Sequence, residues 1–110
     1  SRDAMPDGGH PRRRLDDNFA SPIRFSLMAA LLDGNELDFA TLARILEVGD
    51  SALSKSIAHL NVSGYVATRR GDVGSRPRTW VRSTLKGERA FTAHLRALQE
   101  IVEFGGRQRS

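Results

Sequence analysis

The sequence predicts a small, mainly helical domain with three helices in its core, one β-hairpin and a long C-terminal helix. Three observations lead to this fold class. Apolar residues recur at helical spacing in four separate segments, and two strand-like runs flank a glycine-containing loop between the third segment and the fourth. The chain has 110 residues and no cysteine, so we expect one domain that is held together by packing alone.

Both ends of the chain have a composition that disfavours burial. Residues 1–18 are rich in proline, glycine, arginine and aspartate, so we expect a flexible N-terminal arm there. Residues 105–110 are expected to form a disordered tail, which leaves 19–104 as the folded domain. No segment is apolar enough for a membrane span or a signal peptide, which favours a cytoplasmic protein.

The first helix is predicted over 21–32. Ser21 is a favourable N-cap, and Pro22 suits the first turn of a helix. One face of the helix is apolar and contains Ile23, Leu27 and Leu31. The turn-forming cluster at 33–35 should end the helix, and a short extended link follows it.

Two short helices separated by a tight turn are predicted next. Asp38 should cap a helix over 39–47, and the third helix should end near residue 63 with Gly64 in the left-handed conformation behind it. The apolar stripes of the two helices are Leu42, Ile45 and Leu46, and Leu53, Ile57 and Leu60. The opposite face of the third helix is small and polar, with Ser51, Ala52, Ser54, Lys55, Ser56 and His59.

A β-hairpin with a basic tip is predicted after the third helix. The residues at 65–70 and 79–82 indicate two strands, and the glycine-containing segment 71–75 indicates a loop. Pro77 restrains the residue before it, so Arg76 and Arg78 should lie on a stiff tip. Trp80 is expected to anchor the hairpin rather than to stack on a nucleobase.

The last helix is predicted from the cap residue Thr84 to about Phe104. Its apolar residues follow a 4-3-4 spacing and are Phe91, Leu95, Leu98 and Val102. This stripe is longer than one small domain can cover, and apolar patches of such size are rare on soluble monomers. We therefore expect a homodimer whose interface also includes Phe19 and Ile23.

This order of elements is that of a winged helix-turn-helix fold. Two short helices joined by a tight turn can pack together and leave the outer face of the second one free. A helix that enters the DNA major groove, about 12 Å wide, cannot present bulky apolar or acidic residues to the bases. The small polar face of the third predicted helix meets this requirement, which makes that helix the candidate recognition helix.

Positive charge is concentrated on the same elements. Arginine supplies 15 of the 17 basic residues, and the formal net charge of the chain is +4. Between residues 33 and 50 five acidic residues oppose Arg44, which gives −4, and between 51 and 89 eight basic residues oppose Asp72 and Glu88, which gives +6. A basic recognition helix and hairpin would neutralise phosphates and release counterions on binding DNA.

Several segments of the chain resemble the small winged-helix, MarR/ArsR-like bacterial transcriptional regulators. These segments are SPIR at 21–24, LDFATLARIL at 37–46, ALSKSIAHL at 52–60, GYV at 64–66 and, most specifically, SRPRTW at 75–80. The resemblance matches Ser54 and Lys55 to the family's Ser-Lys on the recognition helix. It matches Arg76 and Arg78 to the wing-tip pair and Trp80 to the aromatic residue of the returning strand, whereas Gly49 and Ala52 depart from the family pattern.

The resemblance implies a homodimeric repressor that binds double-stranded DNA at a pseudo-palindromic operator. The candidate DNA contacts are Ser51, Ala52, Ser54, Lys55, His59, Arg69, Arg70, Arg76 and Arg78. The candidate dimer contacts are Phe19, Ile23, Phe91, Leu95, Leu98 and Val102. A small-molecule effector could occupy a cleft between the first and last helices of the dimer.

Other functions have less support in the sequence. A winged helix used only for protein–protein interaction, the main alternative, would be expected to lose the wing arginines that this chain keeps. RNA binding would require aromatic platforms, and the chain has one tryptophan, one tyrosine and five phenylalanines, most of them expected in the core. No motif indicates an enzyme or a cofactor, and His10, His59 and His94 lack metal-ligand spacing.

Overall fold

The computed structural model describes residues 9–74 and 76–108 and has the predicted winged helix-turn-helix architecture. Its helices are α1 (Pro22–Leu31), α2 (Phe39–Leu46), α3 (Asp50–Val62) and α4 (Leu85–Gln108). Its strands are β1 (Glu36–Asp38), β2 (Val66–Val73) and β3 (Arg76–Ser83). Three 3-10 turns complete it: η1 (Pro11–Arg14), η2 (Asp17–Phe19) and η3 (Leu32–Gly34).

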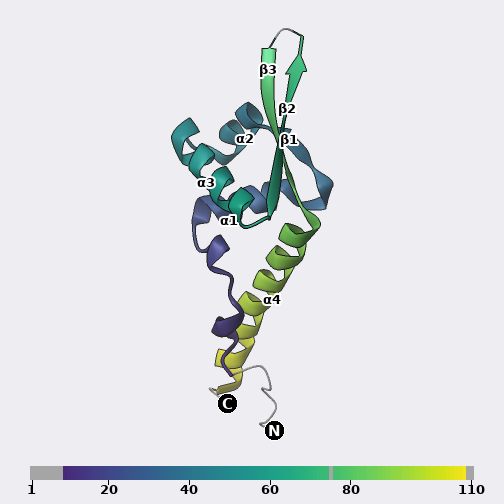
Figure 1. Cartoon of the computed structure of the whole chain (residues 1–110). Coiled ribbons are helices and arrows are strands. Elements are labelled where there is room, and N and C mark those ends of the chain that lie inside the picture. The colour runs from purple at the N-terminus through teal and green to yellow at the C-terminus, as the bar shows by residue number, and fades with distance from the viewer. Residues whose placement is uncertain (1–8, 75, 109–110) are drawn as a thin grey trace.

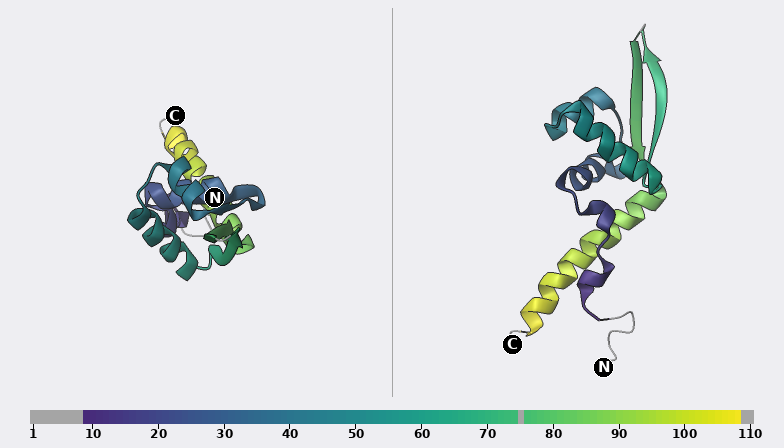
Figure 2. Two further views of the ribbon diagram at one scale, coloured as in Figure 1. Left: turned by 90° about the horizontal axis from the view of Figure 1, so that it is seen from above. Right: turned by 60° about the vertical axis from the view of Figure 1, so that its left-hand side comes forward.

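The molecule is elongated, with principal extents of 62 × 24 × 21 Å. Helices α1 to α3 and the base of the sheet form its body, from which the β2–β3 hairpin projects at one end and α4 at the other (Figure 1). The second view in Figure 2 shows the N-terminal segment running beside α4. The wing and the end of the long helix therefore lie at opposite ends of the molecule.

The three strands form one antiparallel sheet in the order β1-β3-β2. The hairpin is longer than predicted, because β2 and β3 remain paired from Val66 and Ser83 to Val73 and Arg76. Arg76 and Arg78 consequently lie within β3, and the expectation that residues 71–73 belong to the loop is wrong, because they continue β2. Backbone pairing thus fixes the direction of these two side chains.

The core lies where α1, α2 and α3 meet the sheet and the start of α4. Its buried apolar residues are Phe19, Leu27, Met28, Leu31, Leu42, Leu53, Ile57, Leu60, Val66, Val81 and Phe91. Each such side chain contributes about 1.5–3 kcal/mol when it leaves water. Most of these residues come from the stripes that the helical spacing predicted, but Ile45 is 50% exposed and contributes little.

Hydrogen bonds and backbone geometry confirm the predicted starts of α1 and α4 and the predicted end of α3. The Ser21 hydroxyl accepts from the backbone N–H of Arg24 at 3.3 Å, and the Thr84 hydroxyl accepts from that of Gly87 at 3.0 Å. Gly64, with φ of +80°, follows the last turn of α3 in the left-handed region that favours glycine. These local signals therefore place the starts of α1 and α4 and the end of α3 correctly.

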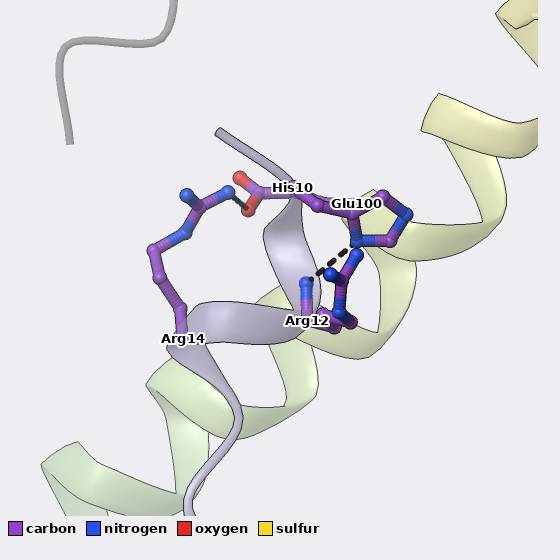
Figure 3. A network of polar contacts seen from close by, with 4 residues as sticks. All are labelled: His10, Arg12, Arg14 and Glu100. Atoms are coloured by element: carbon purple, nitrogen blue, oxygen red, sulfur yellow. Dashed lines mark hydrogen bonds and ion pairs between the residues drawn. The ribbon is translucent and has the colours of Figure 1, made fainter. Parts of the chain in front are cut away.

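Residues 9–18 differ from the flexible arm that composition suggested, because they pack along α4. The ring of His10 lies 4.7 Å from that of Phe104, and Arg14 forms an ion pair with Glu100 at 2.6 Å. Figure 3 shows this pair beside the His10 Nδ1 atom, which accepts from the backbone N–H of Arg12 at 3.0 Å. Long-range pairs of this kind leave no mark in composition. Residues 1–8 of the expected arm lie outside the described residues.

The C-terminal helix also extends further than predicted, through Gln108, so residues 105–108 are helical instead of a disordered tail. Gly105 and Gly106 disfavour a helix, but a helix that is already formed gains one hydrogen bond for each residue added. Residues 109–110 lie outside the described part of the chain. Within 9–74 and 76–108 no helix has both the length and the apolar character needed to cross a bilayer.

Candidate nucleic-acid interface

Helix α3 turns most of its predicted polar face to solvent. Leu53, Ile57 and Leu60 are buried and fix the orientation of the helix. Ser51, Ser54, Lys55 and His59 are exposed, and Ala52 is half-buried. Ser56, expected on the outer face, is buried because it lies three residues after Leu53 and four before Leu60, on the inward side.

The alternation of side chains in the sheet separates the wing arginines into two sets. Successive strand residues point to opposite faces, and Thr68 and Thr79 line a groove together with α3, so they mark the face toward that helix. Arg70 shares the parity of Thr68 and belongs to this face. Arg69, Arg76 and Arg78 lie on the opposite face. The alternation follows from the strand positions in the sequence, but sequence reasoning counted these arginines together and did not assign them to two faces.

Arg69 has two partners on that opposite face. Its Nε and Nη2 atoms donate to the Glu36 carboxylate at 2.9 and 2.8 Å, and its guanidinium lies 5.3 Å from the centroid of the Trp80 ring. The hydrogen bonds from Arg69 lower the pKa of Glu36, and Glu36 in turn raises the pKa of Arg69. Gly71 leaves room for the stack, because a Cβ there would lie 2.9 Å from Arg69 Nη1 and 3.2 Å from Trp80 Nε1.

Arg78 is likewise paired with a carboxylate. Asp38, at the N-cap position of α2, accepts from the Thr41 hydroxyl at 2.5 Å and from Arg78 Nη1 at 3.2 Å. The hydrogen bond from Thr41, and then the charge of Arg78, lower the pKa of Asp38. Arg70 and Arg76 are exposed and have no ion-pair partner within the described residues.

A groove of about 440 Å³ separates α3 from the hairpin. Ser54, Asn61, Thr68 and Thr79 contribute polar groups to its lining, beside apolar residues that include Val62. Hydroxyl and amide groups can donate to phosphates or to base edges. Sequence reasoning missed Asn61, Thr68 and Thr79, because only the strand register and the packing of α3 bring them together.

The N-terminal segment reaches the end of α3 through Asn18. The Asn18 Oδ1 atom lies 3.0 Å from His59 Nε2 and accepts from the Ser63 hydroxyl at 2.7 Å. Asn18 also lines an open hollow together with Lys55 and His59. Sequence reasoning placed Asn18 in the arm, although Asp16-Asp17-Asn18 directly before an aromatic residue is a turn-forming pattern that could have indicated local order.

The candidate dimer residues divide into a buried set and an exposed set. Phe19 and Phe91 are 3% and 2% exposed, and their rings meet edge to face with 5.1 Å between centroids. These two residues therefore belong to the core and are not available to a second chain, contrary to expectation. Ile23 is half-buried, and Leu95, Leu98 and Val102 of α4 are exposed.

A family model described as a winged helix DNA-binding domain matches residues 23–102 of the chain. The structure is similar to that of a transcriptional regulator homologue from Pyrococcus horikoshii OT3, with 25% identity and a TM-score of 0.73 over 80% of this chain and 87% of that one. It is also similar to the transcriptional repressor BigR from Xylella fastidiosa, with 26% identity and a TM-score of 0.61 over 84% and 88%.

The YusO protein from Bacillus subtilis shares the fold at 18% identity, with a TM-score of 0.71 over 93% of this chain and 70% of that one. The comparison with curated proteins found no match. The family match begins within α1 and ends within α4, so it includes both α3 and the wing. The chain therefore belongs to the winged helix DNA-binding domain family.

Proposed function

We propose that the protein is a homodimeric transcriptional repressor that binds double-stranded DNA by sequence, with α3 in the major groove and the wing on the adjacent minor groove. The observation that carries the proposal is the exposed polar face of α3, with Lys55 at its centre and the basic hairpin beside it. Small hydroxyl side chains permit close approach to the bases, and positive charge on both elements attracts phosphates.

On α3 the contacts would come from Ser51, Ala52, Ser54, Lys55 and His59. Lysine donates to guanine O6 or N7, and serine can donate to or accept from several base edges. Helix α3 thus supplies discrimination between sequences.

On the wing, Arg70 and Arg76 would make the first contacts, because neither has a carboxylate partner among the described residues. Arg69 and Arg78 would contact DNA only if a phosphate replaced Glu36 or Asp38. We therefore assign these two arginines a smaller share of the affinity than the sequence alone suggests.

The exposed side chains Leu95, Leu98 and Val102 support a two-fold dimer formed through α4. Two copies of α3 would then read a pseudo-palindrome. Repression is supported by the similarity to BigR, which is named as a repressor. A small-molecule effector between α1 and α4 stays a prediction from the sequence.

Selection of bound sequences from random duplexes, followed by binding titrations, tests the function. We expect a pseudo-palindrome whose half-site centres lie about 10 base pairs, or a multiple of one turn, apart. If the dimer neutralises about 6–10 phosphates, the logarithm of the binding constant should fall with the logarithm of the salt concentration at a slope of roughly −5 to −9.

The variant Lys55→Ala should change the preference at major-groove positions by about 1–3 kcal/mol. Its matched control is Lys86→Ala, which removes the same charge at the start of α4 and should leave the preferred sequence unchanged. A protein that binds no duplex would overturn the proposal and favour the protein–protein interaction module.

A further inference from the structure

We propose that Asn18 is a positioning residue for DNA recognition, which holds the His59 ring with its proton on Nε2. A contact from His59 Nδ1 to a DNA phosphate then requires the uptake of a proton. The DNA contact rests on the proposed function, whereas the position of the proton is a property of the free protein.

Asp16 determines which way the Asn18 amide points. The Asp16 Oδ1 atom accepts from both the backbone N–H and the Nδ2 group of Asn18, each at 2.9 Å, and its Oδ2 atom accepts from the Tyr65 hydroxyl at 2.5 Å. Burial raises the pKa of Asp16, but these hydrogen bonds together lower it by more than burial raises it. The net pKa is below the ordinary value, so Asp16 is ionised at neutral pH. An ionised carboxylate only accepts hydrogen bonds. The amino end of Asn18 must therefore face Asp16, and its carbonyl end faces His59.

The direction of the Asn18 amide in turn determines the tautomer of His59. An amide oxygen only accepts, so His59 Nε2, 3.0 Å away, must carry the proton. In a neutral imidazole the other nitrogen, Nδ1, is then an acceptor. No hydrogen bond within the described residues reaches Nδ1, and the His59 side chain is exposed.

A phosphate oxygen also only accepts, so neutral His59 in this tautomer has no donor to offer it. The contact forms once Nδ1 takes up a proton from solvent. The Nε2–H group then donates to the Asn18 side-chain oxygen, and the Nδ1–H group donates to the phosphate. DNA binding and protonation of His59 are therefore linked.

The surroundings of Asn18 keep it in place and set the charges near His59. The backbone N–H of Asp16 donates to His94 Nδ1 on α4 at 3.0 Å, and Arg24 Nε on α1 donates to the backbone carbonyl oxygen of Asn18 at 2.8 Å. Lys55, one turn before His59 on α3, lines the same open hollow as Asn18 and His59. Tyr65 is held in its neutral form by burial and by Asp16, which raise its pKa.

The position of the proton can be measured in the free protein by ¹⁵N NMR of the histidine rings. At pH 8 we expect His59 as the Nε2–H tautomer in the wild type. The variant Asn18→Ala should give a mixture of both tautomers. The control Asn35→Ala removes an exposed amide from the turn after α1 and should leave the tautomer unchanged. An Nδ1–H ring in the wild type, or no change in Asn18→Ala, would overturn the proposal.

The linkage can be measured with the selected duplex between pH 8 and pH 5.5. We expect the wild-type affinity to rise about tenfold as the pH falls, which corresponds to one charged hydrogen bond. The rise should disappear in His59→Ala, an exposed position whose substitution leaves the core intact, and should shrink in Asn18→Ala, where the neutral ring can donate from Nδ1.

An equal pH dependence in the wild type and both variants would refute the linkage. Failure to bind any duplex at any pH would count against the proposed function, while the tautomer measurement would still decide the role of Asn18.

Discussion

Two carboxylates on β1, Glu36 and Asp38, form ion pairs with Arg69 and Arg78. The charge pattern of the sequence alone predicts that both arginines contact DNA. The Glu36–Arg69 pair is bidentate but exposed, with 30% and 56% of the two side chains accessible. Exposed ion pairs are weak and exchange partners easily. Glu36 therefore competes with phosphates for Arg69, and loss of the ion pair would reduce the stability of the fold only slightly.

Replacing Glu36 with glutamine should raise affinity for duplex DNA at low salt by roughly threefold, because Arg69 gains the freedom to meet a phosphate. Binding titrations of Glu36→Gln and of Asp33→Asn would measure this effect. Asp33 is an exposed acid at the end of α1 with no guanidinium partner among the described residues, so its substitution removes one negative charge without releasing an arginine. Equal gains in the two variants would show that only net charge matters.

At the scale of elements, residues 9–19 join α4 to α3 by polar contacts at both ends. Tyr65, three residues after the end of α3, is central to this contact, because its hydroxyl donates to Asp16 and its ring stacks on Phe19 with 5.4 Å between centroids. Since the pKa of Asp16 is lowered in the folded protein, its charge stabilises the fold above the ordinary carboxylate range. That contribution is lost as the pH falls through the lowered pKa.

The variant Tyr65→Phe should keep the ring contact and lose the hydroxyl. We expect its free energy of unfolding at pH 7 to be lower than that of the wild type by about 1–2 kcal/mol, and the difference to shrink toward pH 2.5, as Asp16 takes up protons. Urea unfolding at both pH values measures this. In an Asp16→Asn background the same substitution should cost less and show no pH dependence. A cost that is equal at both pH values in the wild-type background would contradict the role of the Asp16 charge.

At the scale of the whole molecule, the wing and the free end of α4 lie at opposite ends of a 62 Å long chain (Figure 1). A dimer formed through α4 would therefore leave both copies of α3 and the wing uncovered. The apolar residues available for this contact are fewer than the sequence predicted, because Phe19 and Phe91 are used by the core.

The variant Leu98→Glu should be a folded monomer that has lost most specific DNA binding, because each half-site supplies only part of the free energy. The control Leu85→Glu places the same charge at an exposed leucine on another side of α4 and should remain a dimer. Light scattering gives the answer directly. A wild-type mass near 12.1 kDa, rather than near twice that value, would refute the dimer.

Local patterns were sufficient to predict most of the fold. The caps at Ser21 and Thr84, the left-handed Gly64 and the apolar stripe of α3 each depend on residues within a few positions of one another. Such neighbours interact through backbone geometry that the sequence specifies directly. The sequence by itself therefore determined the order of helices, the existence of the hairpin and the exposed face of α3, apart from Ser56.

Tertiary structure alone decided which candidate residues are free and which are engaged. Asp16 and His94 are 78 positions apart, and Asp38 and Arg78 are 40 apart, so no periodicity links them. The packing of α1 and α4 around Phe19 determines how much of the α4 stripe is exposed, and the path of residues 9–18 brings Asn18 to His59. Helical and strand periods specify which face of an element is apolar, but the partner of each side chain depends on how separate elements pack.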